Sequence, residues 1–470
     1  MSDNNTWLDK AKSDGQAALS GGCHNWPDSV VMGHDCLVIQ EDTPIRVALL
    51  GCGTVGSHVA KLLLEPGDLQ ARVGHPLELI GIGVKHPDRL RPGIDQRLLT
   101  ADVESLADRA DVVIEAIGGI EPARGLLLRA MAHGASVVTA NKVLLGACGP
   151  DLYAAAEAAR VDLYFEAAVA GAIPIIRPLR ESLVGDEILA VKGIVNGTTN
   201  FILDQMTTTG QSFEAALARA QELGFAEPDP TADVEGFDAA AKASLLASLA
   251  FRTEILADQV SRQGITDVRP ADIVSARRMG CVIKLLAIAA PIDSDPAKIS
   301  VRVHPSMVPT SHPLANVHGP YNAIFIESRH AGRLMFLGPG AGGAPTASAI
   351  MGDLVAAARN RVRGTSVPPV TVGSGRTAAG IDEAVAAACV SMEVVDSPGV
   401  LARVAAVFAD HGVSISAVRQ VQSDQNPTAA LLEVTTHPAT SGAVTLAVDQ
   451  LRGMTDTVCG EIRFYRVEEV

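Results

Sequence analysis

The spacing of hydrophobic and polar residues changes twice along the chain. Residues 1–44 are polar and without a clear period, which predicts a loose N-terminal extension. From Ile45 onward, short apolar runs at residues 45–50, 77–84, 111–117 and 135–140 alternate with helical patterns. Strands that alternate with helices are typical of an open parallel sheet. We therefore expect an α/β domain over residues 45–160.

The middle of the chain has a more irregular pattern. Short strand-like runs occur at residues 191–195, 298–303 and 322–328, and the stretch after Phe251 has a helical pattern to about Ala290. This mixture predicts an α+β domain with a mixed sheet over residues 161–330. A glycine turn and a long helix at residues 338–360 indicate that the chain returns to the first domain at about 330–365.

The last hundred residues have the clearest pattern. Residues 366–387 are rich in Gly, Pro, Ser and Thr, which predicts a linker. Over residues 388–470 the expected elements are strand 389–395, helix 399–411, strands 413–422 and 429–436, helix 441–453 and strand 461–467. This order, βαββαβ, is that of a ferredoxin-like unit.

Composition and charge narrow the function. With 47% hydrophobic residues and 19% charged residues in 470, the composition is that of a soluble globular protein of two or three domains. A formal net charge of -15 argues against nucleic acid or an anionic membrane as partner. Seven cysteines without paired spacing, and no apolar run long enough to cross a bilayer, predict a cytoplasmic protein.

A glycine turn follows the first strand. In GCGTVG, Gly51 permits a tight turn, Gly53 lets a pyrophosphate approach the backbone, and Gly56 allows close helix packing, while Thr54 and Val55 open the helix. Placed between a strand and a helix, the motif predicts a Rossmann dinucleotide-binding domain.

Three further positions are expected near the cofactor. Lys85 follows the second strand, and a basic side chain at that position favours binding of the 2′-phosphate of NADP. Ordinary solvated lysine and arginine side chains in a loop would give the same pattern. Gly118 and Gly119 follow the third strand, and Lys142 follows the fourth. Because ligands bind outside the carboxyl ends of parallel strands, all of them should face the cofactor.

The strongest chemical signal lies between Gly224 and Phe251. There an acidic loop leads into an apolar helix whose two charges, Asp238 and Lys242, are spaced i, i+4 on one face. A buried structural ion pair would explain this pattern. A proton-donating lysine beside carboxylates that hold a cationic substrate would explain it too.

Seven motifs in order resemble the homoserine dehydrogenase family, in its long form with a C-terminal ACT domain. They are GCGTVG, DVVIEAIGG, VVTANK, YFEAAVAGAIPII, GIVNGTTNFIL, GFAEPDPTADVEGFDAAAK and GPGAGGAPTASA. The resemblance covers roughly residues 45–470. It implies reversible, NAD(P)H-dependent reduction of L-aspartate 4-semialdehyde to L-homoserine, in threonine and methionine biosynthesis.

The resemblance also implies roles for single residues. Lys242 is similar to the proton donor, Asp238 to its acidic partner and Lys142 to a lysine between nicotinamide and substrate. Glu227 is similar to the residue that holds the substrate amino group, with Asp233 in the same loop. The late glycine that touches the cofactor corresponds to Gly342. The chemistry agrees, since ammonium groups can protonate an alkoxide, carboxylates can bind the substrate ammonium, and Gly197 and Thr198 can meet its carboxylate.

Three more expectations follow from the resemblance. Glu166, Val169, Gly171 and Ile173 are similar to a backbone-carbonyl site for a monovalent cation, sodium in the family. NADP is the expected cofactor, with NAD as an alternative. The ACT unit implies feedback by an amino acid such as threonine, bound near Asp396 to Gly399, and the family implies a homodimer or homotetramer.

A different class of function remains open at this point. The chain could be a catalytically idle amino-acid sensor that keeps the dehydrogenase scaffold and acts through its ACT unit. The presence of both Lys142 and Lys242 argues against it.

Overall fold

The computed structural model describes residues 43–65, 67–370, 373–422 and 429–468. The extension predicted at residues 1–44 therefore lies almost wholly outside the described residues. Within them, no helix is both long enough and apolar enough to cross a membrane.

The first domain contains a six-stranded parallel sheet in the order β3-β2-β1-β4-β5-β6. Its elements are β1 (Ile45–Leu50), α2 (Thr54–Leu64), α3 (Leu69–Val73), β2 (Leu77–Gly83), β3 (Leu99–Thr100), α4 (Val103–Arg109), β4 (Val112–Glu115), α5 (Ala123–Ala132), β5 (Ser136–Thr139), α6 (Lys142–Ala159) and β6 (Leu163–Tyr164). The strand order reverses between β1 and β4, and a nucleotide binds at such a point in open α/β sheets.

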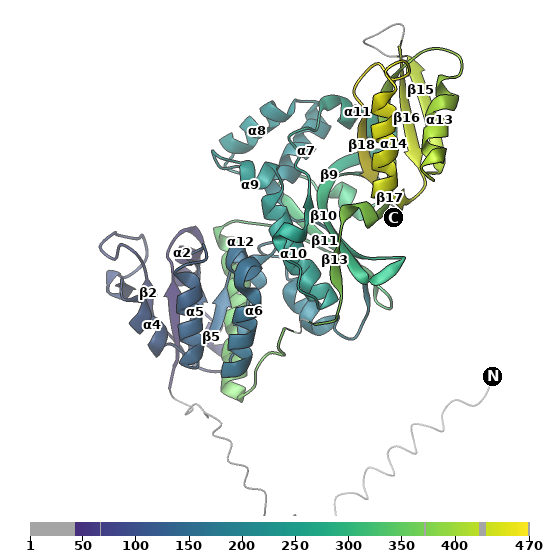
Figure 1. The fold of residues 1–470 in the computed structure, drawn as a ribbon. Helices are drawn as coiled ribbons and strands as arrows, with labels where there is room; N and C mark the ends of the chain where they lie inside the picture. The colour runs from purple at the N-terminus through teal and green to yellow at the C-terminus, as the bar shows by residue number, and fades with distance from the viewer. Residues whose placement is uncertain (1–42, 66, 371–372, 423–428, 469–470) are drawn as a thin grey trace, which may run out of the picture. The chain divides into compact units, whose positions relative to one another are not determined.

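Helices cover both faces of this sheet. Ala48, Leu50 and Val113 pack with residues of α4, α5 and α6. Val47 and Ile114, on the other face, pack with α2 and with α12 (Gly343–Arg363). Figure 1 shows α12, in green, among the purple and blue elements of this domain. The late helix thus completes a layer that the first half of the chain leaves open.

The second sheet has twelve strands within the described residues, with the main order β12-β11-β7-β9-β10-β18-β14-β16-β15. Its first part comprises β7 (Ile188–Ile194), β8 (Ser261–Arg262), β9 (Cys281–Ile292), β10 (Asp295–Pro309), β11 (Tyr321–Ser328) and β12 (Gly332–Pro339). The helices of this part are α7 (Gly197–Thr209), α8 (Phe213–Glu222), α9 (Thr231–Val234), α10 (Phe237–Phe251) and α11 (Pro270–Arg278).

The prediction of helix up to about Ala290 is wrong, because residues 281–292 form the long strand β9. Strand β9 lies between β7 and β10 and is buried over most of its length. A strand covered on both faces has no polar face, so its sequence lacks the alternation that marks a half-exposed strand. The helix-favouring Lys284, Leu285 and Leu286 add to the ambiguity.

The C-terminal unit has the predicted βαββαβ order. It consists of β14 (Val385–Val395), α13 (Val400–Asp410), β15 (Ile415–Gln422), β16 (Ala429–Thr436), β17 (Ala439–Thr440), α14 (Ser441–Gly453) and β18 (Arg463–Val467). Strands β18, β14, β16 and β15 pair antiparallel in that order. The Rossmann, mixed-sheet and ferredoxin-like architecture predicted from the pattern is confirmed.

Three short strands line up along one edge of β10. Strand β13 (Thr377–Ala379) pairs with residues 298–300, β8 with residues 302–303 and β18 with residues 306–307, all in parallel. Part of the segment expected as a linker is therefore regular structure, because this edge supplies backbone partners for it. The same pairing joins the C-terminal unit to the middle domain in one continuous sheet (Figure 1).

Candidate active site

Asp238 is the centre of a buried polar cluster. Its carboxylate accepts hydrogen bonds from the ammonium groups of Lys142 and Lys242, and the Lys242 Nζ to Asp238 Oδ2 distance is 2.7 Å. The Asn196 amide donates to Asp238 Oδ2 at 2.9 Å and to Asp233 Oδ1 at 2.6 Å. Two lysines and two carboxylates predicted from two separate stretches of sequence thus meet at one place.

Three helices begin at this cluster, and each contributes one of its members. Lys142 is the first residue of α6, Asn196 caps the N-terminus of α7 and Asp238 lies in the first turn of α10. The Asn196 side chain accepts the Thr199 N–H at 2.9 Å, so its amide group is left to donate to the two carboxylates. Helix N-termini carry partial positive charge, which suits a substrate carboxylate.

The electrostatics of the cluster keep Asp238 ionised. Burial alone would raise the pKa of Asp238, but the charges of Lys242 and Lys142 outweigh burial and hold the pKa well below its usual range. The Lys242 ammonium also donates to the Val195 carbonyl at 2.8 Å, and its side chain is 10% exposed, against 38% for Lys142. Lys242 is therefore held on two sides, while Lys142 stays open to a ligand.

A chain of side chains connects this cluster to the glycine loop after β4. Asn141, directly before Lys142, donates to the Gly119 carbonyl at 2.6 Å. The buried Glu115 carboxylate accepts the Ile117 and Gly118 N–H groups at 2.7 and 3.0 Å. Gly118 and Gly119 both have positive φ, at 83° and 76°. The loop that ends β4 is thus fixed beside the start of α6.

The first glycine turn has the shape that dinucleotide binding requires. A Cβ on Gly51 would lie 2.5 Å from the Ala116 carbonyl oxygen, and a Cβ on Gly56 would lie 2.2 Å from that of Gly51. No atom of the described residues lies within 4 Å of a Cβ on Gly53, so at that glycine the backbone is open to a phosphate. Thr54 and Val55 begin α2. A Cβ on Gly343, next to Gly342, would clash with the His58 side chain of α2. The late glycine turn therefore packs closely against α2.

The basic cluster after β2 is exposed. Lys85 follows the strand within two residues, and its side chain is open to solvent. The Arg91 guanidinium is anchored by the His86 and Arg89 carbonyls at 3.2 and 2.9 Å. The charge of Arg91 also acts on Cys52, within the first glycine turn. Arg91 therefore lies close to the turn where the cofactor phosphates are expected.

The acidic loop before α10 is held against the start of α7. The Thr198 hydroxyl donates to the Phe225 carbonyl at 2.7 Å, two residues before Glu227. Glu227 itself is exposed, whereas Asp233 is half-buried beside Asn196. Asp233 thus belongs to the cluster, and Glu227 lies at the exposed part of the same loop.

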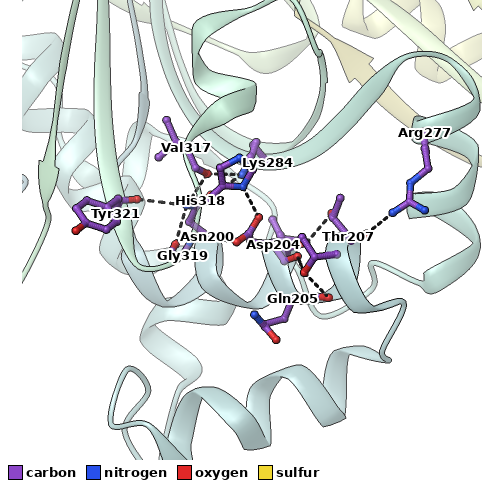
Figure 2. Close-up of polar contacts among 12 residues, drawn as sticks. Asn200, Asp204, Gln205, Thr207, Arg277, Lys284, Val317, His318, Gly319 and Tyr321 are labelled. Atoms are coloured by element: carbon purple, nitrogen blue, oxygen red, sulfur yellow. Dashed lines mark hydrogen bonds and ion pairs between the residues drawn. The ribbon is translucent and has the colours of Figure 1, made fainter.

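A second buried lysine lies behind α7 (Figure 2). Lys284 of β9 donates to Asn200 Oδ1 at 3.1 Å and to the Val317 carbonyl at 2.6 Å. The Asn200 amide donates to the Val317, Gly319 and Tyr321 carbonyls at 3.1, 2.8 and 3.3 Å. Burial lowers the pKa of Lys284 to about 8, although the charge of Asp204 acts in the opposite direction.

These contacts clamp residues 317–321 onto α7. The Asp204 carboxylate accepts the His318 Nδ1 at 2.8 Å and the Gly319 N–H at 2.9 Å. A Cβ on Gly197 would lie 2.6 Å from the Pro320 carbonyl oxygen, so the clamped loop touches the first turn of α7. Figure 2 shows Asn200, Lys284 and His318 converging on this loop.

The turn that follows β6 is also built on buried charges. The Glu166 carboxylate accepts the Ile176 and Arg177 N–H groups at 2.6 and 3.0 Å, and the Glu166 N–H donates to Asp353 at 2.8 Å. Burial raises the pKa of Asp353 to about 7 despite the adjacent Arg177. Gly171 has positive φ, and a Cβ there would meet the Gly340 carbonyl at 2.6 Å. Because the Glu166 carboxylate is occupied, backbone carbonyls are the groups that can hold a cation here.

Sequence reasoning missed the amides and the second lysine. Asn141 and Asn196 each precede a helix, which is the N-cap signal, and that signal could have found them. Lys284, Asn200 and Asp204 had no such signal, because their partners lie 33 to 119 residues away.

Comparisons with known proteins identify the family of each domain. Residues 51–166 match the family model described as homoserine dehydrogenase, NAD binding domain, residues 174–355 match homoserine dehydrogenase, and residues 390–451 match the ACT domain. A homoserine dehydrogenase of Mycobacterium tuberculosis is 52% identical over 436 residues, which cover 91% of this chain and 98% of that protein.

Solved structures extend the comparison. The crystal structure of a homoserine dehydrogenase from Thiobacillus denitrificans is 34% identical, covers 92% of this chain and 100% of that chain, and has a TM-score of 0.84. A hyperthermophilic archaeal homoserine dehydrogenase in complex with NADPH is 26% identical, with a TM-score of 0.57 over 67% of this chain and 98% of that chain. Likeness over the full length does not support the idle-sensor alternative. The chain belongs to the homoserine dehydrogenase family of NAD(P)-dependent oxidoreductases, in the form that carries a C-terminal ACT domain.

Proposed function

We propose that the Asp238 cluster performs proton transfer in the reversible reduction of L-aspartate 4-semialdehyde to L-homoserine. The observation that carries this proposal is the convergence of Lys142 and Lys242 on one ionised carboxylate. A reduced nicotinamide cofactor held at the turn of Gly51, Gly53 and Gly56 would supply a hydride to the aldehyde carbon, and this transfer would leave an alkoxide oxygen. An ammonium at this position stabilises the alkoxide and gives it a proton, and in the reverse direction the amine takes that proton back.

The roles of the two lysines differ in geometry. Lys242 is fixed by Asp238 and the Val195 carbonyl, which orients its ammonium. Lys142 is more exposed and lies beside the glycine loop through Asn141. We assign proton donation to Lys242, and assign to Lys142 contact with the reacting oxygen next to the nicotinamide. Asp238 accepts a hydrogen bond from each of them.

Substrate recognition uses the opposite charges around the cluster. Glu227 and Asp233 hold the substrate ammonium, since both lie in the loop that Thr198 anchors. The substrate carboxylate meets the first turn of α7 at Gly197 and Thr198, where N–H groups have no partner within the helix. An amino acid with a reactive aldehyde at its far end is thereby placed with that end toward the lysines.

For the cofactor, we propose NADP in preference to NAD. The open backbone at Gly53 fits a pyrophosphate, and the exposed Lys85 with the anchored Arg91 fits a 2′-phosphate. The archaeal relative with NADPH supports this preference. We also propose a monovalent cation, sodium, on the carbonyls of Glu166, Val169, Gly171 and Ile173, because positive φ at Ala170 and Gly171 folds this segment into a tight turn.

We further propose regulation by an amino acid, threonine being the first candidate, through the ACT domain. The enzyme would act in the cytoplasm as a homodimer or homotetramer.

The experiment that tests the proposed function is oxidation of L-homoserine followed at 340 nm, with NADP and NAD in parallel, each with and without threonine. Turnover that is faster with NADP supports the assignment. Absence of turnover with both cofactors would overturn it.

A further inference from the structure

Asn322, the second residue of β11, is buried and its side-chain amide is unpaired. The residue is 0% exposed, and neither Nδ2 nor Oδ1 makes a hydrogen bond to another described residue. A buried amide without hydrogen bonds destabilises the folded state, and such groups are rare in proteins. An asparagine at this position therefore needs an explanation other than packing, which an apolar side chain would achieve without that cost.

A second buried asparagine shows what a purely structural amide looks like. The Asn200 amide donates to three backbone carbonyls of the loop at residues 317–321, and its oxygen accepts the Lys284 ammonium (Figure 2). Every polar atom of that side chain has a partner, and the loop is fixed as a result. Asn322 directly follows this loop and fixes none of it by side-chain hydrogen bonds among the described residues.

The Asn322 side chain touches two glycines of the candidate active site. Its Cγ, Nδ2 and Oδ1 atoms occupy the space that a Cβ on Gly340 would need, so the amide lies directly against the backbone of Gly340. Its Oδ1 is also 3.5 Å from the position of a Cβ on Gly197, the first residue of α7. The amide therefore joins the late glycine turn, residues 338–343, to the helix start at which we propose that the substrate carboxylate binds.

The late glycine turn also packs against the start of α2. A Cβ on Gly343 would lie 3.1 Å from the carbonyl oxygen of Thr54, the first residue of α2. The residue before Thr54 is Gly53, where the backbone is open to a phosphate of the cofactor. One short segment of backbone thus contacts Asn322 near its middle and the cofactor-binding helix at its end.

The turn has backbone donors that complement the unpaired amide. Among the described residues, the N–H groups of Ala341 and Gly342 have no hydrogen-bond partner, and both residues are exposed. The positive φ of 115° at Gly342 lies in a region where only glycine rotates freely. Because Asn322 has no exposed area, neither water nor a ligand reaches its amide, and only the adjacent backbone can supply its partners. A rotation of the turn would bring its N–H groups to the Asn322 oxygen.

From this arrangement we propose that Asn322 is a positioning residue for the dehydrogenase reaction. When the cofactor binds beside the late glycine turn, the backbone of the turn pairs with the Asn322 amide, and the cost of the unpaired group is removed. This pairing stabilises the cofactor-bound state and fixes Asn322 against the first turn of α7, where the substrate carboxylate is placed. The inference rests on the proposed function for the positions of both ligands, and Asn322 itself touches neither of them.

The test compares Asn322→Ala with Asn322→Ser in the full chain, because these two variants differ by a single hydroxyl group. Binding of NADPH and of NADH is followed by their fluorescence, and the more tightly bound cofactor is used throughout. Asn322→Ala should raise its Kd about three- to tenfold, which corresponds to the loss of one hydrogen bond, and should raise the KM for homoserine by a similar factor. The kcat should stay within about twofold of wild type, and Asn322→Ser should recover part of the affinity.

Two further measurements separate positioning from packing. Without cofactor, the Tm of Asn322→Ala should lie within about 3 °C of wild type, because the removal of an unpaired amide offsets the lost packing. Ser328→Ala is the matched control, since Ser328 lies at the other end of β11 and its hydroxyl donates to the Gly332 carbonyl at 3.1 Å. Its cofactor Kd should equal that of wild type.

Several outcomes would overturn the inference. A cofactor Kd in Asn322→Ala equal to that of wild type would do so. A large fall in the Tm of the cofactor-free protein, with the same Kd in the alanine and serine variants, would make Asn322 a packing residue only. If Asn322→Ala does not fold, the comparison of Asn322→Ser with wild type decides alone. Homoserine turnover by wild type tests the proposed function separately, because the cofactor Kd is measured without any reaction.

Discussion

Two buried lysines near α7, Lys242 and Lys284, differ in what they touch. Each donates to the carbonyl of a valine, Val195 or Val317. The second partner of Lys242 is the carboxylate of Asp238, whereas that of Lys284 is the neutral amide of Asn200. The first pairing joins two charged side chains next to the acidic loop before α10, and the second fixes the backbone of residues 317–321.

The difference shows that burial alone does not indicate what a lysine does. Burial alone would raise the pKa of Asp238, but the charges of Lys242 and Lys142 hold it well below its usual range, so the carboxylate stays ionised beside Lys242. Around Lys284 the neutral partners do not offset the cost of burial, and the pKa of the lysine falls to about 8. The partner group, and not the depth of burial, separates the lysine that we propose as proton donor from the lysine that clamps the loop at residues 317–321.

Removing Lys242 should have the largest effect. Lys242→Met should lower kcat for homoserine oxidation by roughly 10²–10⁴-fold, because the alkoxide loses its proton donor. Binding of NADPH, followed by its fluorescence, should stay close to that of wild type. Lys142→Met is the matched variant, and the variant with the greater loss of kcat identifies the donor. A Lys242→Met rate within twofold of wild type would contradict the assignment.

Removing Lys284 should change stability rather than chemistry. A lysine with a lowered folded pKa is costly at neutral pH, and the cost disappears as pH rises from about 8 to the unfolded value of 10.5. The free energy of unfolding of wild type should therefore rise by up to about 3 kcal/mol across that range, relative to Lys284→Met. Urea unfolding at a series of pH values measures this difference. Parallel profiles for the two proteins would mean that Lys284 titrates normally.

A substitution at Glu227 tests whether the acidic loop before α10 contacts the substrate. Glu227→Gln should raise the KM for homoserine about tenfold, because a charge-assisted hydrogen bond to the ammonium becomes a neutral one, and kcat should change little. Glu222→Gln, a nearby exposed glutamate on α8, is the control. If the KM for homoserine in Glu227→Gln equals that of the Glu222→Gln control and of wild type, Glu227 does not bind the substrate.

Lys85 is exposed to solvent, in contrast to the two buried lysines, and its substitution should have the smallest effect on activity. Lys85→Asp should shift the ratio of kcat/KM for NADP over NAD a few-fold toward NAD, since an exposed charge pair is worth about 1 kcal/mol or less. The shift should shrink as salt is added. A ratio that does not move would make Lys85 an ordinary surface cation.

Local patterns predicted the fold and the first of the two lysines. The glycine turn at Gly51, the order of elements after residue 388 and the i, i+4 spacing of Asp238 and Lys242 are features of short stretches, and the structure contains each as a local element. Lys284 could not be found in this way, because strand β9 has no alternation and its partners come from α7 and the loop at residues 317–321.

The sequence predicted the charged residues of the candidate site but not its two asparagines. The two lysines and the acidic loop were expected, whereas Asn141 and Asn196, which connect them, were not. Each amide bridges groups that are 22 to 42 residues apart in the chain, and such a connection is visible only in the folded state.

The three short strands along the edge of β10 bear on how the enzyme can be engineered. Ending the chain near residue 373 to remove the proposed feedback would also remove β13 and β18. Residues 298–300 and 306–307 of β10 would then have free backbone groups. An unpaired edge of this kind is a template for aggregation. Point substitutions within the C-terminal domain are therefore the safer way to remove the proposed amino-acid regulation without causing the enzyme to aggregate.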